Sequence, residues 1–149
     1  MKKISVMLVM MLAMATIASG TASAGEKKAG ECPVVSTVVV VGDNSGMAPE
    51  AIKVKPGKYF KVVLYAAGGT GYGWQLSDEN LVSIEAVADS KGPVDKRPLP
   101  GGKARWDFCL RVKPEAVGQE TLHFYLSRPW EKGKKPVQMF DLTVVTEQQ

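Results

Sequence analysis

The sequence predicts an all-β protein, an immunoglobulin-like antiparallel β-sandwich of about seven to eight strands. Short segments alternate apolar and polar residues with the period of a half-buried strand, and Gly and Pro mark turns between them. No segment keeps a helical apolar period over three turns. The chain has 149 residues, which is enough for one domain of ordinary size.

The beginning of the chain is expected to be a secretory signal peptide over residues 1–24. Lys2 and Lys3 precede an apolar run over residues 4–17, and small residues follow up to Ala24. A transmembrane anchor is the alternative, but the apolar run is shorter than the roughly 20 residues that span a bilayer. The protein is therefore expected to be exported, either into a periplasm or out of the cell.

The rest of the chain divides into a leader and one domain. Residues 25–31 are small or charged and are expected to be a flexible leader, and residues 32–149 are expected to fold. Net charge falls from +4 for the whole chain to +2 without residues 1–24, because 17 basic and 15 acidic side chains remain. This balance does not indicate binding to nucleic acid or to a membrane surface.

Seven segments show the alternation or a β-branched run, and they are, in order, residues 36–41, 52–54, 58–66, 81–88, 104–112, 121–126 and 139–145. Residues 36–41 are mostly valine, and residues 52–54 lead into a Pro-Gly turn. The alternation is least regular over residues 81–88. These segments are predicted to be the strands of the sandwich.

The segment at residues 104–112 alternates most clearly. One face is apolar and is expected to point into the core; it carries Trp106, Phe108, Leu110 and Val112. The opposite face carries Arg105, Asp107, Cys109 and Arg111. Cys109 is therefore expected to point away from the core.

Cys32 and Cys109 are the two cysteines of the chain, and an even pair in an exported protein is a candidate disulfide. Closing so long a loop is worth roughly 4 kcal/mol on the chain-entropy model. The segment that carries Cys32 would then have to run across the outside of the sheet. Two unpaired thiols, or a catalytic Cys109 paired with His123, are the alternatives.

Three connections between predicted strands have a composition that suggests binding. They are the Gly-rich residues 66–74, the Pro- and Gly-containing residues 97–103, and residues 127–136, which include Arg128-Pro129-Trp130. Alternate connections of an immunoglobulin-like sandwich gather at one end, and rigid folds often place binding residues on such loops. Trp and Arg often carry the binding energy of protein interfaces, and Pro129 stiffens the backbone between them. The three connections therefore indicate a protein that docks onto another protein.

The sequence argues against an enzyme. It contains a single histidine, no Gly-x-Ser-x-Gly motif, no phosphate-binding Gly-rich loop and no Cys/His cluster for a metal. Asp78-Glu79 is a pair of carboxylates in a polar, turn-like stretch, where solvation is the simpler interpretation. No cofactor or metal is expected.

The three connections resemble the marker loops of chagasin-type inhibitors of papain-like cysteine peptidases. Those loops carry, in order, the motifs Asn-Pro-Thr-Thr-Gly-aromatic-x-Trp, Gly-x-Gly-Gly and Arg-Pro-Trp/Phe. The corresponding residues here are 67–74, 99–102 and 128–130, in the same order and at similar spacing. The resemblance implies an immunoglobulin-like sandwich, with residues 32–149 as a chagasin-like inhibitor domain.

The resemblance also implies reversible, competitive inhibition by steric blocking of the active-site cleft, without covalent chemistry. The first loop would enter the cleft, Trp130 would pack beside the catalytic centre, and the second loop would touch the opposite wall. The residues expected to bind the peptidase are Gly68, Gly69, Thr70, Gly71, Tyr72, Gly101, Gly102, Arg128, Pro129 and Trp130. Lys132, Lys134 and Lys135 either steer the protein toward an acidic surface or form a solvated loop. The inhibitor is expected to act as a monomer.

The chain departs from the family pattern in the first two loops. Residues 67–69 are Ala-Gly-Gly in place of Asn-Pro-Thr, and Leu99-Pro100 replaces Gly-x. Glycine at position 68 leaves the loop more freedom to lose on binding than proline would, so weaker inhibition is expected unless the glycines admit a closer approach. The alternative function is a non-inhibitory immunoglobulin-like binding or assembly module of the cell envelope, in which the first loop is only a turn before a core Trp74.

Overall fold

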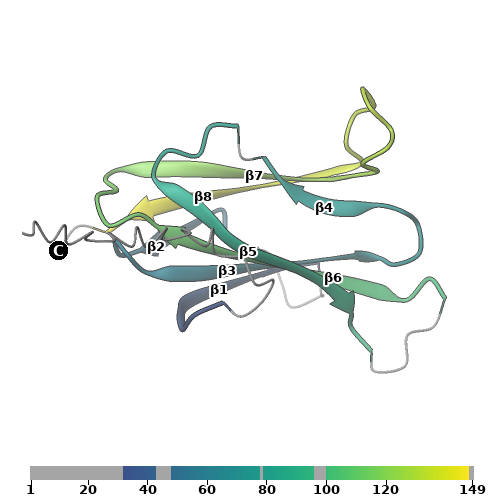
Figure 1. The fold of residues 1–149 in the computed structure, drawn as a ribbon, viewed down its shortest axis with the longest axis horizontal. Helices are drawn as coiled ribbons and strands as arrows, with labels where there is room; N and C mark the ends of the chain where they lie inside the picture. The colour runs from purple at the N-terminus through teal and green to yellow at the C-terminus, as the bar shows by residue number, and fades with distance from the viewer. Residues whose placement is uncertain (1–31, 43–47, 78, 96–99, 148–149) are drawn as a thin grey trace, which may run out of the picture.

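The computed structural model describes residues 32–42, 48–77, 79–95 and 100–147 (Figure 1). The signal peptide and the leader expected over residues 1–31 lie outside the described residues. The described chain forms eight strands, which are β1 (Val35–Val41), β2 (Ala51–Val54), β3 (Tyr59–Ala67), β4 (Gly73–Leu76), β5 (Ile84–Pro93), β6 (Lys103–Val112), β7 (Gln119–Ser127) and β8 (Gln138–Thr146). Within these residues, no helix has the length and apolar character needed to cross a membrane.

The strands form two four-stranded sheets that face each other, so the predicted β-sandwich is confirmed (Figure 1). The strand orders are β1-β3-β6-β5 and β2-β8-β7-β4. The sheets are mixed rather than purely antiparallel, because β1 pairs with β3 and β2 pairs with β8 in parallel. The chain passes from β1 in one sheet to β2 in the other before it returns to β3, and such a crossover allows a parallel pair where a hairpin does not.

Two strands differ from the sequence prediction. The segment predicted over residues 81–88 begins later and extends to Pro93, and its register shifts between Ala86 and Ala88. A β-bulge of this kind adds a residue to one strand, which explains the irregular alternation in the sequence. The short strand β4, which was not predicted, emerges from the Gly-rich connection and pairs with the end of β7.

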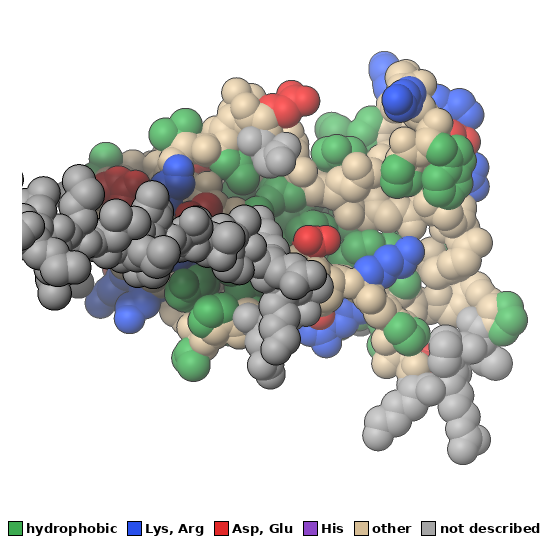
Figure 2. Space-filling model, viewed as in Figure 1, with side chains coloured by type: hydrophobic (Ala, Val, Ile, Leu, Met, Phe, Trp, Pro, Cys, Tyr) green, Lys and Arg blue, Asp and Glu red, His purple; other side chains and the backbone are tan. Residues whose placement is uncertain are grey.

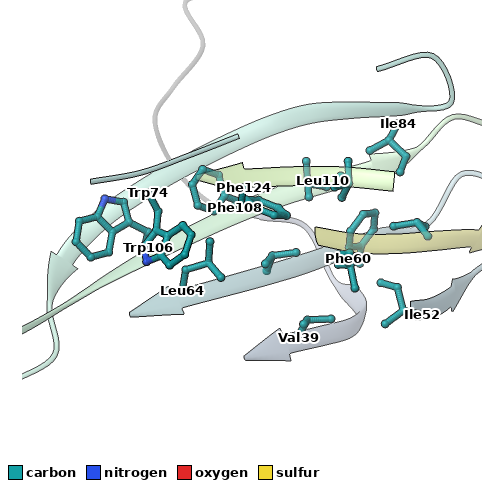
Figure 3. Packing of buried hydrophobic residues seen from close by; sticks show 14 of the residues in the cluster. Val39, Ile52, Phe60, Leu64, Trp74, Ile84, Trp106, Phe108, Leu110 and Phe124 are labelled. Carbon is teal, nitrogen blue, oxygen red and sulfur yellow. The ribbon is translucent and has the colours of Figure 1, made fainter. Parts of the chain in front are cut away.

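The core lies between the two sheets and is built from their inward-facing apolar residues (Figure 3). The four residues predicted to face the core from β6 are all buried, with Leu110 and Val112 completely inaccessible. Phe108 of β6 meets Phe124 of β7 edge to face, with ring centroids 5.2 Å apart. This aromatic contact joins central strands of opposite sheets and contributes about 0.5–1.5 kcal/mol beyond burial of its apolar area.

Cys32 and Cys109 form the predicted disulfide, with Cα atoms 5.5 Å apart. Cys109 lies on the face of β6 opposite the core residues, so Cys32 reaches it from outside the sheet, past β3, which separates β1 from β6. The bonded sulfur is no nucleophile. His123 lies on the other sheet from Cys109, where its Nδ1 is 2.8 Å from Oδ1 of its neighbour Asp141. The alternatives of free thiols and of a catalytic Cys-His pair are therefore wrong for this structure.

Removal of the disulfide is expected to destabilise the fold substantially. Cys32→Ala should lower the free energy of unfolding by about 2–4 kcal/mol, because the bond closes a loop with a sequence separation of 77. Denaturant unfolding with and without reductant measures the loss. The reduced wild type should lose a similar amount and Cys32→Ala should not respond to reductant; a wild type insensitive to full reduction would contradict the expectation.

Candidate functional site

The three connections singled out in the sequence lie at the same end of the sandwich (Figure 1). Loop 1 (residues 68–72) joins β3 to β4 and so passes from one sheet to the other. Loop 2 (residues 94–102) joins β5 to β6 within the first sheet, and loop 3 (residues 128–137) joins β7 to β8 within the second. Residues 96–99, which include Leu99 of the second motif, lie outside the described residues.

Loop 1 is held by a local turn around Thr70. Its Oγ1 donates to the carbonyl oxygen of Ala67 at 3.0 Å and accepts the amide of Tyr72 at 3.4 Å. A threonine hydroxyl bonded in this way supports a turn that the backbone alone would not hold. Gly69 and Gly71 flank it with positive φ angles of 75° and 79°, a region that other residues enter only with strain.

Loops 1 and 2 are joined through their backbones. The amide of Gly68 donates to the carbonyl oxygen of Gly102 at 2.6 Å. A Cβ atom on residue 68 would lie 2.6 Å from that same oxygen, which is closer than side-chain carbons approach. Position 68 therefore needs an N–H, which excludes proline, and no side chain, which leaves only glycine. The proline of the family motif would supply neither.

Loops 1 and 3 are joined through Arg128. Its Nε donates to the carbonyl oxygen of Thr70 at 3.1 Å, and its guanidinium carbon lies 4.4 Å from the centroid of the Tyr72 ring. A cation–π contact at a partly exposed site contributes about 0.5–1 kcal/mol. The guanidinium of Arg128 thus contacts loop 1 twice, through a hydrogen bond from its edge to Thr70 and through its face on the Tyr72 ring.

The side chain of Trp130, a residue of loop 3, packs against loop 1 but is largely exposed to solvent. A Cβ atom on Gly71 would lie 2.5 Å from Cη2 of the Trp130 ring, so the ring packs directly on the glycine backbone. The side chain is nevertheless 67% exposed, which is unusual for tryptophan in a soluble domain. One side of the ring packs on protein backbone, and much of the rest is exposed to solvent. An aromatic side chain held in this way is suited to anchor a binding partner.

Charged side chains lie along loop 3, and Figure 2 shows Lys and Arg side chains on this protruding loop next to hydrophobic ones. Glu131 accepts a hydrogen bond from Arg128 at 3.2 Å and lies 3.4 Å from Nζ of Lys134. Loss of hydration raises the pKa of Glu131, but the hydrogen bonds and positive charges of Arg128 and Lys134 outweigh it, so the pKa lies below its ordinary value. Glu131 is therefore ionised at neutral pH.

An open groove of 510 Å³ lies between loops 1 and 2. Backbone and small side chains line much of it, including those of Gly68, Gly69, Gly101 and Gly102, together with Lys91–Pro93 at the end of β5. Glycine-lined walls leave main-chain groups accessible to a partner with few side chains in the way. Among the described residues, no group of three or more His, Cys, Asp or Glu side chains is arranged to hold a metal ion.

All ten residues expected to bind a peptidase belong to these three loops, and the disulfide lies elsewhere, on the outer face of the first sheet. The sequence did not reveal Glu131 or the end of β5 as parts of the site. The spacing of Glu131 from Arg128 and Lys134, three residues on each side, was the available signal, but only the turn of loop 3 brings the charges together.

Substitution of Gly68 is expected to be harmful even where it restores the family motif. Gly68→Pro and Gly68→Ala should each lower the free energy of unfolding by about 1–3 kcal/mol, because the new Cβ atom meets the Gly102 carbonyl and proline also removes the N–H donor. Gly92→Ala is the control, since a Cβ atom there meets no atom within 4 Å and should change stability by less than about 0.5 kcal/mol. Denaturant unfolding compares the variants, and equal effects at the two positions would contradict the role of Gly68.

The sequence matches a known protein family. The family described as "Chagasin family peptidase inhibitor I42" matches residues 53–144. Amoebiasin-2 of Entamoeba histolytica is 30% identical over 87 residues, which cover 57% of this chain and 68% of that protein.

Solved structures share the fold at lower identity. The cysteine protease inhibitor EhICP2 from Entamoeba histolytica superposes with a TM-score of 0.56 at 23% identity, covering 74% of this chain and 96% of EhICP2. PbICP-C, solved in complex with falcipain-2, superposes with a TM-score of 0.51 at 17% identity, covering 74% of this chain and 99% of PbICP-C.

The family match spans most of the sandwich, from β2 to β8, and includes all three loops. The chain therefore belongs to the chagasin family of peptidase inhibitors and is not an enzyme.

Proposed function

We propose that this protein is a reversible, competitive inhibitor of papain-like cysteine peptidases that covers their active-site cleft with loops 1, 2 and 3. The observation that carries this proposal is the exposed Trp130, held on the backbone of Gly71 within a cluster of three connected loops. Family membership supports it, and so does the related fold of PbICP-C in its complex with falcipain-2.

The connections between the loops explain how a modest surface can bind tightly. Ordering flexible loops at an interface reduces the affinity, and loops that are already ordered avoid this loss. The Gly68–Gly102 hydrogen bond and the contacts of Arg128 with Thr70 and Tyr72 order the loops before binding. They also offset the freedom that the glycines of loop 1 would otherwise have.

Each loop has a distinct role in the proposed complex. Residues 68–72 enter the cleft and lie over the catalytic Cys and His of the peptidase, where glycine allows a close backbone approach. Trp130, directed by Pro129, packs beside the catalytic centre, and Gly101 and Gly102 meet the opposite wall of the cleft. In this complex Arg128 and Tyr72 act mainly by shaping the loops, since their side chains contact each other.

We further propose that the protein is exported as a monomer after removal of residues 1–24, with residues 25–31 as a leader and residues 32–149 as the inhibitor domain. The Cys32–Cys109 disulfide is consistent with an oxidising compartment such as a periplasm or the exterior of a cell. Whether its peptidase is endogenous or foreign determines which of these compartments matters.

Trp130→Ala is expected to weaken inhibition by about 2 kcal/mol or more, roughly thirty-fold, as for the loss of an aromatic anchor. Its unfolding free energy should change by less than about 0.5 kcal/mol, because the side chain is largely exposed. Purified residues 25–149 are titrated against papain and cathepsin-like enzymes at several substrate concentrations.

Val117→Ala is the matched control, since Val117 is 65% exposed on the connection between β6 and β7 at the opposite end of the sandwich (Figure 1). It should inhibit like the wild type. Absence of inhibition by the wild type at micromolar concentrations would refute the inhibitor function and favour a non-inhibitory binding module.

A further inference from the structure

The charged residues next to Trp130 form a continuous series of contacts that ends on loop 1. Oε1 of Glu131 accepts a hydrogen bond from Nη1 of Arg128 at 3.2 Å. Nε of the same guanidinium donates to the carbonyl oxygen of Thr70 at 3.1 Å. The guanidinium of Arg128 therefore donates from one edge to the carboxylate of Glu131 and from another edge to the backbone of loop 1.

These contacts leave the guanidinium little freedom. Its plane is rigid, so two hydrogen bonds to different partners fix its orientation, and the ring of Tyr72 covers its face at 4.4 Å. The side chains of Arg128 and Glu131 are only 33% and 22% exposed. Their ion pair is therefore less screened by solvent than one on an open surface.

The backbone of loop 3 places the carboxylate over Arg128. The amide of Glu131 donates to the carbonyl oxygen of Arg128 at 3.0 Å, which closes a tight turn around Pro129 and Trp130. Trp130 thus belongs to a turn whose end residues, Arg128 and Glu131, form an ion pair. Its ring packs on Gly71 of loop 1, the same loop that Arg128 contacts. If Arg128 moved, loop 1 would lose its contacts with the guanidinium, and the ring of Trp130 would lose its fixed position on Gly71.

We propose that Glu131 is a positioning residue for inhibition, which orients Arg128 so that loop 1 and Trp130 keep a single arrangement before a peptidase binds. This inference rests on the proposed function and assigns the carboxylate a role within the inhibitor. A role in direct contact with the enzyme would be a different mechanism.

The charges around Glu131 support the same assignment. The groups that face it are Arg128 and Lys134, and Lys135 and Tyr72 line the same small cavity of 160 Å³. Because the pKa of Glu131 is lowered in the folded protein, its contribution is complete above the ordinary range of a glutamate. The contribution is lost as the pH falls through the lowered pKa.

Glu131→Gln tests the inference in the free protein, with Glu115→Gln as the matched control on the exposed connection between β6 and β7. The backbone amide NMR signals of Thr70, Gly71 and Tyr72 should move and exchange faster with solvent in Glu131→Gln, and should stay unchanged in the control. In the wild type these signals should titrate below the ordinary glutamate range, and in Glu131→Gln they should not. Loop 1 signals unaffected by Glu131→Gln would overturn the proposal.

Inhibition of papain by the full mature chain provides the second test. Glu131→Gln should weaken inhibition about fivefold, as for loss of a partly screened ion pair, with little change in unfolding free energy. In an Arg128→Ala background, Glu131→Gln should have no further effect, because Glu131 acts through Arg128. Arg128→Lys should resemble Arg128→Ala, since lysine lacks the planar edge that reaches Thr70.

A full effect of Glu131→Gln in the Arg128→Ala background would mean direct contact with the peptidase and would overturn the positioning role. If the wild type inhibits no papain-like enzyme, the proposed function fails. The amide signals of the free protein then still decide whether Glu131 orders loop 1.

Discussion

The structure depends on the packing of two apolar sheet faces, centred on the contact between Phe108 and Phe124. Phe108 belongs to β6 and Phe124 to β7, and each strand lies in the interior of its own sheet. Burial of these faces removes apolar surface from water and supplies the main favourable term in folding. Loop 2 leads into β6 and loop 3 leaves β7, so the packing of these two strands holds both loops at one end of the sandwich (Figure 1). The binding end of the molecule is therefore positioned by the core.

Loop 1 completes this arrangement, because it crosses from the first sheet to the second between the other two loops. It is attached on one side by a backbone hydrogen bond from Gly68 and on the other by the side chain of Arg128. The first attachment needs a residue without a side chain, and the second needs a rigid planar donor. The glycines of loop 1, which would make an isolated peptide flexible, here permit the close contacts that order it. The same glycines are thus flexible in the unfolded chain and ordered in the folded loop.

Arg128 and Trp130 of the Arg-Pro-Trp motif have different roles: Arg128 contacts the rest of the protein, and Trp130 is exposed to solvent. Arg128 turns inward, where Thr70, Tyr72 and Glu131 occupy its edges and its face. Trp130 turns outward and remains 67% exposed. An inhibitor of this design uses its charged residue to reduce the entropy lost on docking and its aromatic residue to gain contact area. The affinity then depends on internal geometry as much as on the surface that a peptidase would touch.

The sequence by itself determined the sandwich, the inward face of β6 and the three loops, because alternation and Gly/Pro content are local signals. It also determined the disulfide partners, because two cysteines can pair in only one way. Tertiary structure decided the rest. The parallel edge pairs and the bulge in β5 depend on which strands meet across the chain, and local pattern contains no such information. The need for glycine at position 68 arises from a carbonyl of Gly102 in another loop. The contact of Glu131 with Arg128 arises from a turn that only the folded loop adopts. Contacts between loops are long-range, so only the folded chain could show why the departures of loop 1 from the family motif fit this protein.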